Sequence, residues 1–167
     1  QKAWEDKLEP VFHCNIETST VPIPDFTYKA IHRPAPPIMT ASPRVLIPVF
    51  PGTNCEYDTQ RAFERAGATT DIFVINNLSS AAIEESVREF ARRLQKAQII
   101  MIPGGFSGGD EPDGSGKFIT AFFRNPRIKD GVHELLKNRD GLMLGICNGF
   151  QALVKLGLVP YGEIVEM

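Results

Sequence analysis

The strongest candidate for chemistry is a cysteine between two glycines, in the segment Gly145-Ile146-Cys147-Asn148-Gly149. Glycines two residues before and two residues after a nucleophile are typical of a nucleophile elbow, here with cysteine in place of serine. In an elbow the nucleophile sits on a sharp strand-to-helix turn, where the partial positive charge of the helix N-terminus stabilises a thiolate. Cys147 is therefore predicted to be a catalytic nucleophile, with the Asn148 N–H facing a developing oxyanion. A buried structural cysteine at a glycine-rich turn is the alternative.

The other two cysteines fit a catalytic role less well. Cys55 also follows an apolar run and opens a predicted helix, but it lacks the elbow glycines, and Glu56 beside it disfavours a thiolate. We interpret Cys55 as structural or as lining the site, and Cys14 has no partner pattern. Three widely spaced cysteines predict neither a disulfide framework nor an all-cysteine zinc site, so we expect no metal.

A glycine-rich segment over residues 103–110 (PGGFSGGD) is the second candidate for chemistry. Small residues after an apolar run let backbone N–H groups approach a carboxylate or an oxyanion closely. A plain flexible loop is the alternative. The nearby Gly114-Ser115-Gly116-Lys117 is not a phosphate-binding P-loop, because Glu111 stands in the place of the first glycine.

A cysteine nucleophile needs a histidine base and a carboxylate that orients this base. The chain has three histidines, His13, His32 and His133. The first two lie in a proline-rich arm, and His133 lies within a predicted helix, where it is expected to face solvent. No histidine follows a predicted strand, so the base is expected to be missing from these 167 residues.

Apolar runs and helical periodicity predict the elements that position these residues. Strands are predicted over Val45–Phe50, Asp71–Ile75, Gln98–Ile102 and Gly141–Ile146. Helices are predicted from a cap at Asn54 to Ala66 and over Ala81–Leu94, Lys117–Arg124, Arg127–Lys137 and Gly149–Leu156. The alternation predicts an α/β fold with a parallel sheet covered on both faces. Because functional loops follow the carboxyl ends of such strands, the two candidate segments and residues 51–55 are expected to converge on one site.

Composition and charge exclude several classes of protein. The chain has 167 residues and a mass of 18.5 kDa, which fits one domain with an extra arm. A formal net charge of −2 removes the electrostatic case for binding nucleic acid or an anionic membrane. No apolar run is long enough to span a membrane and no leader is recognisable, so a cytoplasmic protein is expected.

The first part of the chain differs in composition from the rest. Residues 1–51 contain nine of the 13 prolines and no glycine, whereas all 14 glycines lie from residue 52 onward. Since proline favours extended backbone, residues 31–43 are predicted to be an extended linker. The apolar residues among the first 30 favour packing against a neighbouring domain.

Three segments together resemble the triad-type (class I) glutamine amidotransferases, and more narrowly the glutaminase domain of phosphoribosylformylglycinamidine synthase in purine biosynthesis. They are Phe50–Glu56 (FPGTNCE), residues 103–110, and Gly145–Gln151 (GICNGFQ). The resemblance covers about residues 44–160. It implies a flavodoxin-like open parallel sheet with helices on both faces, incomplete at its C-terminus.

The resemblance also implies a reaction and an oxyanion hole. Cys147 would attack the carboxamide of L-glutamine and give a glutamyl thioester and ammonia. Backbone N–H groups of Gly105 or Phe106 and of Asn148 would form the oxyanion hole.

Further site residues and partners follow from the same resemblance. Gln151, Asn54 and Ser107 would contact the bound glutamine. Ammonia would pass to a synthetase domain of the same polypeptide, a ligase that converts formylglycinamide ribonucleotide to formylglycinamidine ribonucleotide. ATP and magnesium would belong to that synthetase domain, and no cofactor is expected in this one.

Two features depart from the family pattern. The family's catalytic His and Glu lie in a His-x-Glu segment well downstream of the elbow, whereas this chain ends 20 residues after Cys147. The resemblance therefore implies a fragment without its base, inactive in hydrolysis by itself. The proline-rich arm resembles the connector of the large single-chain synthase. Residues 1–43 would then be a linker from a preceding synthetase domain, and residues 44–167 the N-terminal part of the glutaminase domain.

Two other functions remain open at this point. One is a cysteine hydrolase or chaperone of the intracellular-protease and deglycase type, which has the same fold but places an acidic residue near its elbow cysteine. The other is a non-catalytic glutaminase-like module that docks on a synthetase. Glutamine-dependent labelling separates the first alternative from a glutaminase, and a downstream His-x-Glu segment separates the second.

Overall fold

The computed structural model describes residues 39–106 and 116–165, together with residues 7, 10, 11, 22 and 27. Residues Gln1–Ala35 and Pro36–Met167 form two separate compact units. Residues 31–38 of the predicted linker over residues 31–43 lie outside the described residues, and residues 39–43 are described and form neither helix nor strand. The elements described below all belong to the second unit.

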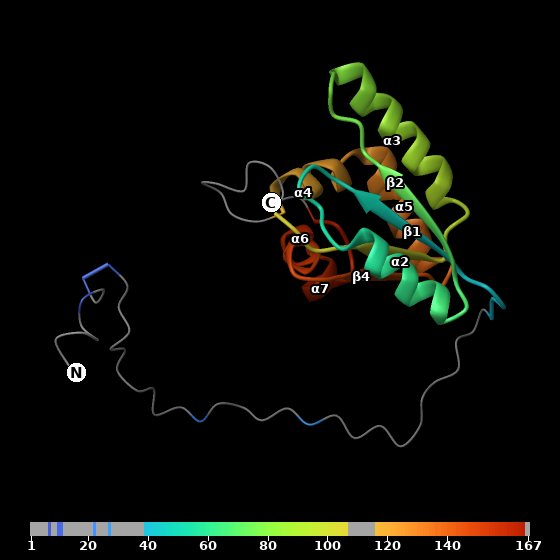
Figure 1. Ribbon diagram of the computed structural model, residues 1–167, viewed down its shortest axis with the longest axis horizontal. Coiled ribbons are helices and arrows are strands. Elements are labelled where there is room, and N and C mark those ends of the chain that lie inside the picture. Colours follow the sequence, from blue (N-terminus) through green and yellow to red (C-terminus); the bar gives the residue numbers. More distant parts are fainter. Residues whose placement is uncertain are drawn as a thin grey trace. The chain divides into compact units, whose positions relative to one another are not determined.

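The described residues form four strands in one all-parallel sheet (Figure 1). The strands are Arg44–Val49 (β1), Thr69–Val74 (β2), Ile99–Ile102 (β3) and Leu142–Gly145 (β4). Their order is β2-β1-β3-β4, with Leu46 paired with Ile100 and Met101 with Leu144. This order in a parallel sheet is that of flavodoxin-like folds, which confirms the predicted fold class.

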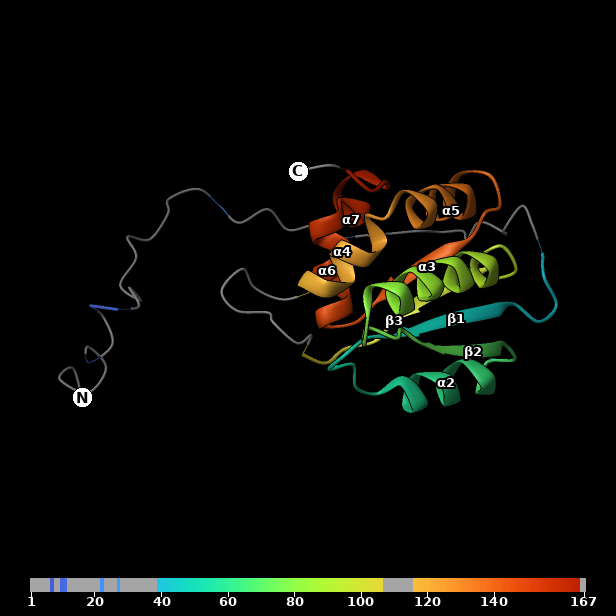
Figure 2. The same ribbon diagram turned by 90° about the horizontal axis from the view of Figure 1, so that it is seen from above.

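Helices lie on both faces of this sheet, but unequally (Figure 2). They are Glu56–Arg65 (α2), Ser80–Leu94 (α3), Lys117–Phe123 (α4), Pro126–Lys137 (α5), Asn148–Leu156 (α6) and Leu158–Tyr161 (α7). In the described part of the chain, α2 alone covers one face, whereas α3, α4, α5 and α6 cover the other.

The core is divided in the same way, because successive side chains of a strand point to opposite faces of the sheet. Val45 and Ile47 of β1 are fully buried on the α2 side, where they pack with Met101 and Phe63. Leu46, between them, belongs to the larger cluster on the opposite side. Both faces of β1 are therefore apolar, as expected for a central parallel strand.

The helix ends agree with the predicted breaks at most positions. Ser79 caps α3 by accepting a hydrogen bond from the Ala82 N–H at 3.1 Å, and Gly157 ends α6 with a φ of 91°. The predicted cap of α2 at Asn54 is wrong by one residue: Cys55 is the N-cap, with a φ of 67°. The short helix α7 was not predicted, because Pro160 within it and the flanking Gly157 and Gly162 favour a turn.

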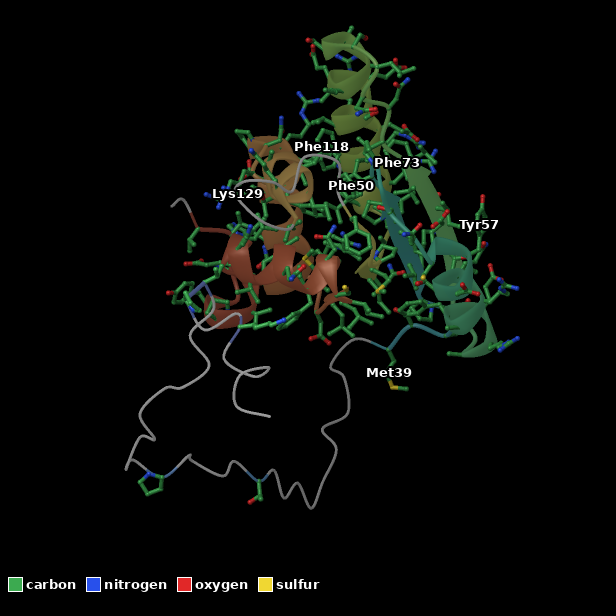
Figure 3. All side chains as sticks on the ribbon, turned by 60° about the vertical axis from the view of Figure 1, so that its left-hand side comes forward. Met39, Phe50, Tyr57, Phe73, Phe118 and Lys129 are labelled. Atoms are coloured by element: carbon green, nitrogen blue, oxygen red, sulfur yellow. The ribbon has the colours of Figure 1, made fainter. Side chains whose placement is uncertain are left out.

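An aromatic cluster anchors the end of β1, next to the loop over residues 51–55. The ring of Phe50 packs edge-to-face with Phe118 at 5.9 Å and Phe122 at 5.4 Å between ring centroids. Phe90 of α3 contacts Phe122 at 5.4 Å as well. In Figure 3 Phe50 and Phe118 lie toward the middle of the second unit, whereas Tyr57 lies at its outer edge, on α2. Each such pair contributes about 0.5–1.5 kcal/mol beyond its buried area, so residue 50 is held firmly.

The chain after α7 folds back against α5 and α6. The buried Ile164 donates its N–H to Nε2 of His133 at 3.0 Å, and Val165 donates to the Leu156 carbonyl oxygen at 2.9 Å. An ion pair joins Lys137 and Glu163 at 2.8 Å. His133 was expected to face solvent; instead it is half-buried and fixes this returning segment.

Acid is expected to weaken this attachment. Burial lowers the pKa of His133 below its usual 6.5, with help from Lys137 and Lys129 and against the opposing charges of Glu163 and Asp130. A lowered pKa in the native state means that its contribution to stability is complete above the unfolded-state pKa and falls as the pH drops below it.

The prediction is that wild-type stability falls more steeply than that of His133→Gln between about pH 7.5 and about pH 5.5. Glutamine can still accept the hydrogen bond but does not titrate. Urea unfolding at several pH values measures the difference, and the other two histidines cancel between the proteins. Parallel stability curves would contradict the role given to His133.

Candidate active site

Cys147 sits between β4 and α6 in a backbone conformation that few non-glycine residues adopt. Its φ is 52° and its ψ is −111°, and its side chain is exposed. Such a conformation costs on the order of 1–3 kcal/mol and persists only where the surrounding structure enforces it. Strain at an exposed thiol on a helix N-terminus is the geometry of a nucleophile elbow.

The two elbow glycines are required by close backbone packing. A Cβ atom on Gly145 would lie 2.6 Å from the carbonyl carbon of Gly149 and 2.8 Å from the Leu153 side chain. On Gly149 it would overlap the carbonyl oxygen of Ile102 and lie 2.9 Å from that of Pro103. The first turn of α6 therefore rests directly on the end of β3, and no other residue type fits at either position.

The loop that follows β1, over residues 51–55, and the loop that follows β3, from residue 103, are joined by backbone hydrogen bonds. Asn54 donates its N–H to the Gly104 carbonyl oxygen at 2.9 Å, and Phe106 donates to the Gly52 carbonyl oxygen at 2.9 Å. Thr53 and Gly105 form an isolated antiparallel bridge between them. Gly105 has a φ of 132°, and a Cβ there would lie 2.8 Å from the Asn54 nitrogen.

The joined loops also meet the elbow. A Cβ on Gly104 would lie 3.3 Å from the Cβ of Cys147 and 3.5 Å from the Ile146 carbonyl oxygen. Residues following β1, β3 and β4 are thus brought together at the carboxyl edge of the sheet, where ligands bind in open α/β folds. A substrate at Cys147 would lie against glycine backbone on one side.

The candidate oxyanion-hole donors differ in their availability. The Phe106 N–H is engaged with Gly52, as described above, so it is not offered to a ligand. Within the described residues the Gly105 N–H donates no hydrogen bond. Asn148 is buried and is the first residue of α6. First-turn N–H groups point toward the positive end of a helix, so Gly105 and Asn148 are the better pair of candidates.

The remaining predicted site residues are placed as follows. Gln151 is exposed one turn beyond Cys147, and its N–H donates to the Cys147 carbonyl oxygen at 2.9 Å. Asn54 is exposed at the joined loops, next to the exposed Cys55. Ser107 lies outside the described residues.

Among the described residues the one histidine is His133, which lies in α5. It accepts a hydrogen bond from the Ile164 N–H in the segment that returns after α7. His13, His32 and Cys14 lie outside the described residues. The described part of the chain has no cluster of side chains suited to a metal ion, and none of its helices is long and apolar enough to cross a membrane.

Sequence reasoning missed Thr53 as an organising residue. Its Oγ1 accepts a hydrogen bond from the Phe50 N–H at 2.9 Å, and its own N–H donates to the Phe50 carbonyl oxygen at 2.9 Å. These bonds close the turn after β1 and present Asn54 to Gly104. A threonine directly after Pro51-Gly52 is the signal that could have found it.

Most of the second unit is similar to known proteins. The family model described as a CobB/CobQ-like glutamine amidotransferase domain matches residues 42–167. Phosphoribosylformylglycinamidine synthase subunit PurQ of Methanococcus maripaludis (strain C5) is 40% identical over 129 residues, which are 74% of this chain and 44% of that protein. The subunit of the same name from Dehalococcoides mccartyi is 40% identical over 118 residues, covering 70% and 41% of the two chains.

A solved structure is also similar. The structure of PurLQS from Thermotoga maritima aligns with a TM-score of 0.48 at 27% sequence identity, covering 70% of this chain and 45% of that one. The chain spans less than half the length of the curated relatives named above.

The packing of the elbow predicts unequal costs for two glycine substitutions. Gly149→Ala is expected to destabilise the protein by about 2–3 kcal/mol, because its methyl group meets backbone that cannot move aside. Gly162→Ala is the matched control: its φ is 73° but the space around it is open, so a cost of about 1 kcal/mol is expected. Denaturant unfolding measures both, and equal costs would contradict the contact between α6 and β3.

Proposed function

The chain belongs to the CobB/CobQ-like glutamine amidotransferase domain family, and from that premise we propose that it is the nucleophile-bearing part of a glutaminase. In this proposal Cys147 uses L-glutamine as substrate and supplies ammonia for the conversion of formylglycinamide ribonucleotide to formylglycinamidine ribonucleotide. The strained conformation of Cys147 at the head of α6 is the observation that carries the proposal. The names of the PurQ relatives support the choice of ammonia acceptor.

The first step is nucleophilic attack on the carboxamide carbon. The Cys147 thiolate forms a bond to that carbon, and the carbonyl oxygen takes up the negative charge of a tetrahedral intermediate. The N–H groups of Gly105 and Asn148 are proposed to stabilise this charge. Because they are backbone groups fixed by the bridge to Thr53 and by α6, they need no reorganisation during the reaction.

Collapse of the intermediate breaks the bond from carbon to nitrogen. The leaving nitrogen takes a proton and departs as ammonia, which leaves a glutamyl thioester on Cys147. Water then attacks the thioester, giving glutamate and the free thiol. Gln151 and Asn54, both exposed, are proposed to hold the polar groups of the glutamine. Ser107, which follows Phe106 in the sequence, is proposed to assist them.

Both proton transfers require a base. His133 is engaged with Ile164, and we propose that the base is a histidine of a His-x-Glu segment beyond Met167, as the family resemblance implies. We also propose that the 43-residue arm connects to a synthetase domain of the same polypeptide, a large single-chain synthase. That domain would hold ATP and magnesium.

The nucleophile is tested by substitution in the complete synthase. Cys147→Ala is expected to lower glutamine-dependent formation of formylglycinamidine ribonucleotide by at least about a thousandfold. Synthesis from added ammonium chloride is expected to continue, because the synthetase reaction does not use the thiol. Cys55→Ala is the matched control and should retain glutamine-dependent activity. Full activity of Cys147→Ala with glutamine would overturn the assignment.

A second prediction concerns the 167-residue chain by itself. Without a base it should release no ammonia from glutamine in steady-state turnover, while remaining folded. Glutamate formation in a coupled assay, with unfolding followed on the same sample, measures this. Sustained turnover that Cys147→Ala removes would show that the base lies within these residues.

A further inference from the structure

The turn that follows β1 is closed by two hydrogen bonds between the same two residues. It spans residues 50–53, with Pro51 and Gly52 at its centre, and Gly52 has a φ of 84°. Proline followed by a glycine of positive φ is typical of a type II turn. The Thr53 N–H donates to the Phe50 carbonyl oxygen at 2.9 Å, and the Phe50 N–H donates to Oγ1 of Thr53 at 2.9 Å. The second bond alone requires a hydroxyl side chain.

The Thr53 hydroxyl gives the Phe50 N–H a partner that the sheet does not provide. The pairing of β1 with β2 ends at Val49 and Val74, so Phe50 lies beyond the paired residues. Phe50 is 3% exposed, and its ring packs edge-to-face with Phe118. Because a buried N–H without a partner is costly, the hydroxyl ties the turn to an anchored residue of the core.

The same turn sets the direction of one peptide group next to the thiol. Asn54 donates its N–H to the Gly104 carbonyl oxygen at 2.9 Å, so this carbonyl points toward residues 51–55. In a trans peptide the C=O and N–H bonds point in opposite directions, and the Gly105 N–H is therefore directed away from residues 51–55. In the strand order β2-β1-β3-β4 the elbow lies on that other side. A Cβ on Gly104 would lie 3.3 Å from the Cβ of Cys147.

The hydrogen bond from Asn54 also makes the Gly105 N–H a stronger donor. A peptide group whose carbonyl oxygen accepts a hydrogen bond is polarised, which strengthens the N–H at its other end. Gly105 is pressed against the turn, since a Cβ there would overlap the Gly52 carbonyl oxygen. Both the direction and the strength of this donor therefore depend on where the turn over residues 50–53 lies.

We propose that Thr53 is a positioning residue for the reaction at Cys147. Its hydroxyl holds the turn in the place from which Asn54 orients the peptide group between Gly104 and Gly105, and that group presents its N–H to the developing oxyanion. Thr53 acts through two successive hydrogen bonds rather than by contact with the substrate. This inference rests on the proposed function and adds to it a residue that acts on the transition state from outside the reacting atoms.

The alternative is a threonine that only stabilises its own loop. Pro51 and Gly52 already specify the turn, and the Thr53 N–H keeps its bond whatever the side chain. Loss of the hydroxyl should therefore displace the turn rather than unfold it. Displacement of a catalytic group by about 1 Å can lower a rate about a hundredfold. The rate of glutamine hydrolysis, compared with the binding of glutamine, is the quantity that separates the two roles.

Thr53→Val in the complete synthase tests the proposal, because valine has nearly the same shape but no hydroxyl. Both kcat and kcat/KM for glutamate formation are expected to fall about 10- to 100-fold, with the KM for glutamine changed by less than about threefold. Synthesis from ammonium chloride should be unchanged. Thr53→Ser keeps the hydroxyl and should have a kcat within about threefold of the wild-type value.

Ser79→Ala is the matched control. It also removes a hydroxyl oxygen that accepts a backbone N–H, that of Ala82 at 3.1 Å, but at the head of α3 and not in the loops around Cys147. Its kinetics with glutamine should equal those of the wild type. Limited proteolysis of each variant checks that the domain stays folded.

The proposal would be overturned by an unchanged kcat in Thr53→Val, or by a rise in KM with kcat unchanged. A loss of kcat of the same size in Thr53→Ser or in Ser79→Ala would also overturn it. So would a loss in Thr53→Val of resistance to proteolysis or of synthesis from ammonium chloride, because the hydroxyl would then hold the fold and not the donor.

Cys147→Ala, assayed beside these variants, separates this inference from the proposed function. Glutaminase activity that persists in Cys147→Ala would contradict the proposed function itself. An inactive Cys147→Ala together with a fully active Thr53→Val would contradict only the role given to Thr53.

Discussion

The site depends on one contact between backbones, that of the first turn of α6 with the end of β3. Gly149 lies so close to the Ile102 and Pro103 carbonyl oxygens that a single methyl group would overlap the first of them. Gly145 makes room from the other side of the turn. Because the helix is pressed onto the strand, Cys147 is forced to a φ of 52° and its thiol is carried out to the surface. Strain at Cys147 is thus supported by packing over the whole length of α6.

The other two loops are arranged around this contact by hydrogen bonds rather than by apolar packing. Phe50, anchored among the rings of α4, fixes where the first loop begins, and Thr53 closes its turn. The bridge between Thr53 and Gly105 then places glycine backbone next to the thiol. Backbone held beside an exposed thiol in this way suits the proposed reaction, in which negative charge develops on a carbonyl oxygen.

Local patterns were sufficient for the fold class and for the elbow. Alternating apolar runs and helical periodicity gave the four strands and five of the helices, and the spacing of Gly145 and Gly149 predicted a turn that the structure contains. Features set by distant contacts were not predictable. The Phe106 N–H is taken by Gly52 across two loops, and His133 is half-buried because Ile164 returns to it from 31 residues away. The cap of α2 at Cys55 depends on a left-handed backbone conformation, which the preference of asparagine for caps did not reveal.

Mapping the alkylation of each cysteine by a glutamine-like electrophile tests the central claim most directly. The claim is that the elbow and its neighbouring loops form a glutamine site around Cys147. The account predicts selective modification of Cys147, suppressed by excess glutamine, with Cys55 labelled slowly and independently of glutamine. Equal labelling of Cys14, Cys55 and Cys147, unchanged by glutamine, would contradict it.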